Sequence, residues 1–227
     1  MSRRWLLLAL GVAVMACGES AAPTTSTAPS TTVTPATTTT APSTTTVALV
    51  EPPWAAAPLE QGQVPSVLLE QWGRAENRET CAALAPLGGV EGATPRGANF
   101  AGGWAVAWDA PDGPGMRADG TFCEDCGRSA VGVAGTGTAV EESLIRSWPD
   151  VIEWSDGSLS GYGNEGQMSD LPVTDPVTAG AVSPTKLAYL AVAGQECLYN
   201  VWSRRGEAEL LDLIERLRFV EGLGGAP

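Results

Sequence analysis

The chain changes composition at about residue 50, and this change limits where a folded core can form. Residues 18–50 consist mainly of Thr, Ser, Ala and Pro, with prolines at positions 23, 29, 35 and 42. Such a segment cannot bury enough apolar surface to offset the entropy lost on ordering. We therefore predict a disordered tether over residues 17–50 and one globular domain over residues 51–227.

The segment before the tether has the organisation of an export signal. Arg3 and Arg4 precede an apolar run from Trp5 to Ala16, and Cys17 follows directly. The run is too short to cross a membrane, which takes about 20 apolar residues. Residues 1–16 are therefore predicted to be a signal peptide.

The four residues Val14-Met15-Ala16-Cys17 resemble the lipobox of bacterial lipoproteins, with Met15 at a position that is usually small. The resemblance covers only the first 17 residues. It implies that Cys17 is lipidated and holds the protein at the cell membrane, with the domain on the extracytoplasmic side. An ordinary signal peptide cut near Ala16 is the alternative, and the two arginines leave ordinary and twin-arginine export both open.

Charge and composition exclude several classes of protein. The chain has 13 basic and 26 acidic side chains, a net charge of −13, and no histidine. A nucleic-acid-binding protein normally needs a basic stripe, so we expect no nucleic-acid partner. Without histidine there can be no Ser-His-Asp triad and no His-ligated metal. We expect no cofactor and no metal.

An even number of cysteines in an exported domain favours disulfides, here with three possible pairings. We predict two bridges, because one cysteine lies on the apolar face of a predicted hairpin and another closes a helix expected to pack on the sheet. The predicted pairs are Cys81 with Cys197 and Cys123 with Cys126.

The motif Cys123-Glu124-Asp125-Cys126 also admits a redox or a zinc site. The two carboxylates between the sulfurs should raise the pKa of the thiols. This argues against a redox-active site, because the reactive form of cysteine is the thiolate. A four-cysteine zinc site normally uses two such motifs, and the sequence has one.

Periodicity predicts an α+β fold with a mostly antiparallel sheet and a helix packed on it from each end of the domain. Helices are expected over residues 66–80, with Ser66 as N-cap, and over residues 207–220. Strands are expected over residues 103–108 and 129–135, and a hairpin joins residues 186–193 to 197–202. The apolar face of that hairpin contains Leu190, Val192, Cys197, Tyr199 and Val201.

A second hairpin is predicted over residues 151–162. Asp156-Gly157 is typical of a type I′ turn, which would place Trp154 opposite Leu159 and Glu153 opposite Ser160. Trp154 and Leu159 would then share a buried face, and the other face would be in water.

Three groups of residues could form binding sites, and each has a structural alternative that we favour. Glycines at 132, 135 and 137 could form a phosphate loop, but a strand surrounds them. Asp109, Asp112 and Asp119 could hold calcium, but they lack the spacing of a calcium loop and suit turns. Trp104 and Trp108 share one strand face and could stack on a sugar, but tryptophans at this spacing are usually core.

Two classes of function remain. The first, which we favour, is a membrane-tethered, non-catalytic binding or structural module of the cell envelope. The alternative is a hydrolase of cell-wall or extracellular glycan that uses two carboxylates, Glu141 or Glu142 with Asp156 or Glu165. The one lysine, Lys186, lies in no motif that would make it a nucleophile.

Overall fold

The structure is a computed structural model that describes residues 49–164 and 185–224. The helices are α1 (Ser66–Arg74), α2 (Glu142–Arg146) and α3 (Glu207–Glu215), with 3-10 turns η1 (Pro53–Ala55) and η2 (Gln61–Gln63). The strands are β1 (Leu84–Pro86), β2 (Thr94–Gly97), β3 (Trp104–Asp109), β4 (Gly115–Met116), β5 (Phe122–Cys123), β6 (Val131–Ala139), β7 (Asp150–Glu153), β8 (Leu159–Asn164), β9 (Lys186–Ala191), β10 (Cys197–Ser203) and β11 (Leu217–Phe219). Among the described helices, none is long and apolar enough to cross a membrane.

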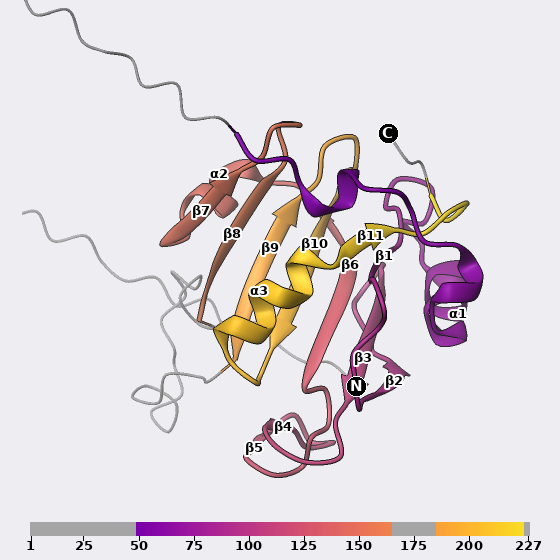
Figure 1. The fold of residues 1–227 in the computed structure, drawn as a ribbon, viewed down its shortest axis with the longest axis vertical. Helices are drawn as coiled ribbons and strands as arrows, with labels where there is room; N and C mark the ends of the chain where they lie inside the picture. Colours follow the sequence, from indigo (N-terminus) through magenta and orange to yellow (C-terminus); the bar gives the residue numbers. More distant parts are fainter. Residues whose placement is uncertain (1–48, 165–184, 225–227) are drawn as a thin grey trace, which may run out of the picture. The chain divides into compact units, whose positions relative to one another are not determined.

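Seven strands form one antiparallel sheet in the order β2-β3-β6-β10-β9-β8-β7 (Figure 1). Helix α1 contacts β3, and α3 contacts β10 and β9. The prediction of an α+β fold with a mostly antiparallel sheet is therefore confirmed. The small sheets β1-β11 and β4-β5 were not predicted.

The main core lies between one face of the large sheet and a layer made of α1, α3 and the β1-β11 pair. Side chains alternate along each strand, so every second residue of the central strands points into this core. From the sheet come Trp104, Val106, Trp108, Val131, Val133, Leu190, Tyr199 and Val201, and from the covering layer Leu68, Leu84, Leu210, Leu213, Leu217 and Phe219.

The covering layer is joined to the sheet by a disulfide between Cys81 and Cys197, which confirms the predicted pairing. Cys197 begins β10, and Cys81 comes shortly before β1. Both residues are buried in the main core. The structure also joins Cys123 to Cys126, at the end of the loop that contains β4 and β5.

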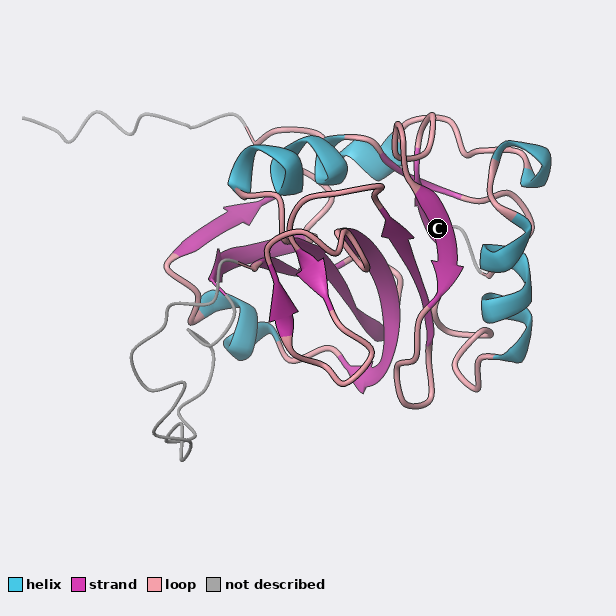
Figure 2. Ribbon diagram, turned by 90° about the horizontal axis from the view of Figure 1, so that it is seen from below, coloured by secondary structure: helices cyan, strands magenta, loops and turns pink. Residues whose placement is uncertain are grey.

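The opposite face of the sheet is covered at one end by α2, so that helices lie on both sides of the sheet (Figure 2). Nearer the middle, the Trp202 indole lies against Gly132 of β6 and stacks on Phe100 at 5.9 Å between ring centroids. Small residues in β6 and β3 leave room for these rings.

Both predicted terminal helices extend too far. Helix α1 ends at Arg74 and not at residue 80, and Ser66 is its first residue, since Pro65 holds the N-cap position. Helix α3 ends at Glu215, and the residues from Leu217 to Phe219 form β11, which pairs with β1. Pairing with a distant strand outweighed a local helical pattern at this end of the chain.

The hairpin of β7 and β8 differs from the prediction by one residue in register. Glu153 lies opposite Leu159, and Ile152 lies opposite Ser160. The predicted partner of Leu159 was Trp154, which instead belongs to the loop.

The loop chemistry explains the difference. The Trp154 N–H donates to the Ser158 carbonyl, and the Gly157 N–H donates to the Trp154 carbonyl. Gly157, with φ of 86°, takes the left-handed position of a bulge that follows the turn. The connection is therefore longer than a two-residue type I′ turn.

A slip of one residue exchanges the two faces of a strand. Ser160 points into the main core and accepts a 2.7 Å hydrogen bond from Trp154 Nε1, whereas Leu159 packs on the opposite face beside α2. The prediction that Trp154 and Leu159 share a face is wrong, and so is the prediction of one solvated face, because β8 is buried on both sides in its first half.

Candidate functional site

A groove of about 580 Å³ lies between α3 and the loop that follows β1. Its volume is within the range of about 300–1,000 Å³ typical of ligand sites. The lining residues come from two segments more than 100 positions apart in the sequence: Leu87, Gly88, Gly89 and Glu91 from the loop, and Arg205, Glu209, Asp212 and Arg216 from α3 and its flanks.

The helix side of the groove is a stripe of four charged side chains. Glu209, Asp212 and Arg216 follow one another at spacings of three and four residues, which places them on one side of a helix with 3.6 residues per turn, and Arg205 lies just before the helix. Arg216 pairs with Asp212 at 2.7 Å, and Arg205 pairs with Glu209 at 3.8 Å. The opposite side of α3 is in the core.

The loop side is held to the helix by Arg216. Its Nη1 donates to the carbonyls of Leu87 (3.2 Å) and Gly89, and its backbone carbonyl accepts from the Leu87 N–H at 2.8 Å. Asp212 holds the same guanidinium through Nε at 2.8 Å. The donors of Arg216 are thus used to fix the two sides of the groove relative to each other.

The loop itself is a turn in which three glycines have left-handed backbone conformations. Gly88, Gly89 and Gly92 have φ of 75°, 68° and 68°. A Cβ built on any of them would meet no atom within 4 Å. We call residues 88–92 the glycine turn; at its glycine positions it presents bare backbone, and Leu87 beside it is 46% exposed.

A smaller cavity of about 160 Å³ lies near the first turn of α3. Lys186 pairs there with Glu207 at 3.0 Å. Burial raises the pKa of the neighbouring Tyr162 hydroxyl, and the charges of Asp150 and Glu207 raise it further. The lysine thus forms a salt bridge at the start of β9, between this strand and α3.

The residues of the predicted hydrolase are placed as follows. Glu142 pairs with Arg146 at 3.7 Å on α2. Asp156 lies in the β7–β8 turn, where it accepts hydrogen bonds from Ser158 and, at 3.4 Å, from Trp54 Nε1. Glu141 is the N-cap of α2, and Glu165 is outside the described residues. The proposed pairing stays a prediction.

The tryptophan and glycine groups have the structural roles that we favoured. Trp104 and Trp108 are both in the main core. Glycines 132 and 135 lie within β6, which pairs with β3 and β10. A Cβ on Gly132 would collide with the Trp202 ring, and one on Gly135 with Trp104 and Cys81. The glycines are needed for close packing at these positions.

Two of the three aspartates, Asp109 and Asp119, lie in separate local networks. Asp109 accepts two hydrogen bonds from Arg96, at 2.9 and 3.2 Å, and one from the Ser129 N–H at 2.7 Å. Asp119 accepts from the backbone and the hydroxyl of Thr121, as in a turn. Among the described residues, no three His, Cys, Asp or Glu side chains lie together as a metal site would require.

Asp109 gives a testable dependence of stability on pH. Burial raises the pKa of its carboxyl, but hydrogen bonds from Arg96 and Ser129 and the charges of Arg96 and Arg128 outweigh burial and lower it below 3.8. A carboxylate with a lowered pKa stabilises the fold above the unfolded pKa, and this contribution is lost as the pH falls through the folded value. Asp109→Asn should therefore be less stable than wild type at pH 6, with a smaller difference at pH 3.

Urea unfolding at the two pH values measures this difference. Asp112→Asn, in the loop that follows β3, is the matched control for the change from aspartate to asparagine. A difference between Asp109→Asn and wild type that is the same at both pH values would contradict the assignment.

The groove itself was not predicted. The spacing of the charged residues from Arg205 to Arg216 could have indicated a polar helix face, and Gly88-Gly89 a turn, but no local pattern brings the two together. Comparison of the chain with family models, with curated proteins and with solved structures found no match. The use of the groove is therefore inferred from its own chemistry.

Proposed function

We propose that the protein is a lipoprotein of the cell envelope, anchored to the membrane by a lipid on Cys17, whose domain is a non-catalytic binding module facing the extracytoplasmic side. The lipobox and the Pro-rich tether support the anchor. The Cys81–Cys197 bridge supports export, because disulfides persist in oxidising compartments.

The observation that favours binding is the braced groove. Its charged side chains come from both sides, and Arg216 holds those sides together through two backbone carbonyls and Asp212. A site with a fixed shape and many hydrogen-bonding groups is suited to recognition, since little ordering remains for the ligand to induce.

The anchor is tested in cells with Cys17→Ala. Wild-type protein should be recovered with membranes and partition into detergent. The variant should lose its lipid and leave the detergent phase, because a modified thiol is the attachment point. Equal partitioning of the two proteins would contradict the anchor.

The hydrolase alternative is tested by incubating the full chain with purified cell-wall glycan. The binding module should release no new reducing ends. Release that is abolished by Glu142→Gln or by Asp156→Asn would establish the carboxylate pair and overturn the non-catalytic function.

A further inference from the structure

The charges of the groove are not equally available to a ligand. Arg216 is held by Asp212 and by backbone carbonyls. Arg205 and Glu209 form a longer pair at 3.8 Å, with side chains 42% and 29% exposed, and exposed pairs of this kind are weak. Glu91 is exposed on the loop side. Asp212 is 57% exposed but pairs with Arg216 at 2.7 Å. Among the lining residues, the charges that no short ion pair holds are therefore those of Glu91, Glu209 and Arg205.

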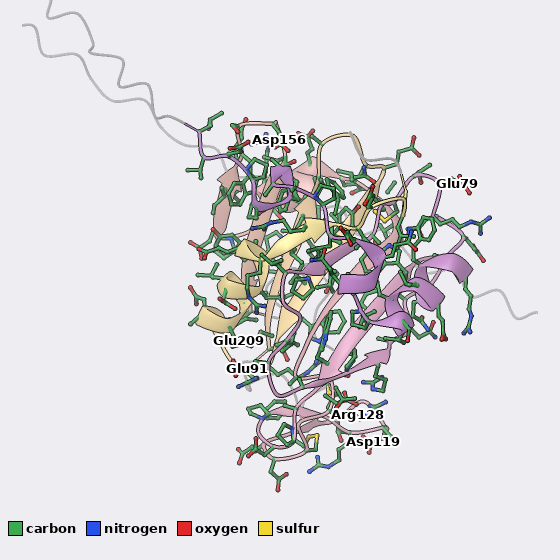
Figure 3. All side chains as sticks on the ribbon, turned by 45° about the vertical axis from the view of Figure 1, so that its right-hand side comes forward. Glu79, Glu91, Asp119, Arg128, Asp156 and Glu209 are labelled. Carbon is green, nitrogen blue, oxygen red and sulfur yellow. A yellow bond between two sulfur atoms is a disulfide. The ribbon has the colours of Figure 1, made fainter. Side chains whose placement is uncertain are left out.

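Glu91 and Glu209 both line the groove, one from the loop side and one from the helix side. Figure 3 shows the two side chains near each other, one from the glycine turn and one from α3, with Glu79 elsewhere on the domain. A cationic group between these carboxylates would be attracted by both. The net charge of −13 would also steer a cationic ligand toward the protein.

The rest of the groove fits a peptide better than a sugar. No aromatic side chain is among the lining residues, so a stacking platform for a pyranose is missing from this groove. Leu87 offers an exposed apolar surface that suits the aliphatic stem of a lysine or arginine. The glycine turn lets another backbone approach closely, because its glycines project no side chains.

We propose that the groove binds a short cationic peptide segment, with a basic side chain lying on Leu87 and its charge between Glu91 and Glu209. The peptide backbone lies along the glycine turn. This inference rests on the proposed binding function, of which it specifies the ligand class.

The test uses the full chain in detergent and dye-labelled five-residue peptides with blocked ends, made of alternating glycine and lysine. A matched peptide has glutamate in place of lysine. Fluorescence anisotropy should detect binding of the lysine peptide, weakened by added salt, and much weaker binding of the glutamate peptide.

Two double variants distinguish binding in the groove from general attraction of the peptide to the negative charge of the protein. Glu91→Gln combined with Glu209→Gln should weaken binding of the lysine peptide about tenfold. Glu79→Gln combined with Glu124→Gln removes the same charge outside the groove and should change binding less than about twofold. Melting curves check that both variants fold.

Three results would overturn the proposal: no binding of the lysine peptide, equal loss in the two double variants, or preference for the glutamate peptide. Binding of the glutamate peptide that is lost in Arg205→Gln would overturn the ligand class and leave the binding function standing. Failure of the anchor would show separately, in the partitioning of Cys17→Ala.

Discussion

Replacing Cys81 and Cys197 together by alanine should lower the free energy of unfolding by about 5 kcal/mol in the chain-entropy estimate. The bridge joins positions 116 residues apart, and its loss frees most of the domain in the unfolded state. Native domains are stable by about 5–15 kcal/mol, so this variant should be largely unfolded or close to it.

The second bridge provides the matched control. Cys123 and Cys126 are three residues apart, and a loop of that length is worth only about 2 kcal/mol in the same estimate. Urea unfolding followed by tryptophan fluorescence compares the two double variants. Equal losses of unfolding free energy in the two double variants would contradict the conclusion that the Cys81–Cys197 disulfide contributes more to stability.

Gly135→Ala should destabilise the domain by about 3 kcal/mol through overpacking. A Cβ at this position would lie under 3.0 Å from Cys81 Sγ and from the Trp104 indole, which are both buried. Neither neighbour can move away easily, because the disulfide fixes one and the core encloses the other.

Gly73→Ala is the control for the change from glycine to alanine. Gly73 lies in α1, and a Cβ at this position would meet no atom within 4 Å. Alanine should therefore stabilise the helix by up to about 1 kcal/mol. Thermal unfolding of both variants gives the comparison. If Gly135→Ala left the stability unchanged, β6 would have room for a methyl group beside Cys81 and Trp104. That result would contradict the close packing inferred for this strand.

Two hairpins show what local sequence can and cannot determine. The hairpin of β9 and β10 was predicted with the correct faces, since Leu190, Val192, Cys197, Tyr199 and Val201 all lie in the main core. In the hairpin of β7 and β8, β7 has only four residues, and β8 contains one serine and two glycines. Its register was decided by one residue in the loop, and the turn dipeptide alone was not a sufficient guide.

The covering layer and the groove depend on contacts between residues far apart in the sequence, which local sequence patterns do not predict. β11 forms where a helical pattern continues, because Leu217 to Phe219 pair with β1, more than 100 residues earlier. The same pairing places the glycine turn next to the end of α3. Arg216 could be recognised in the sequence only as a charged residue on a helix, and its bonds to Leu87 and Gly89 follow from the tertiary fold.

The central proposal is a lipid-anchored module outside the cytoplasm, and mass spectrometry of the mature N-terminus tests it most directly. We predict that the first residue is Cys17 and that it bears a diacylglyceryl group. An unmodified N-terminus at any residue after Cys17, or a chain that keeps residues 1–16, would contradict the proposal.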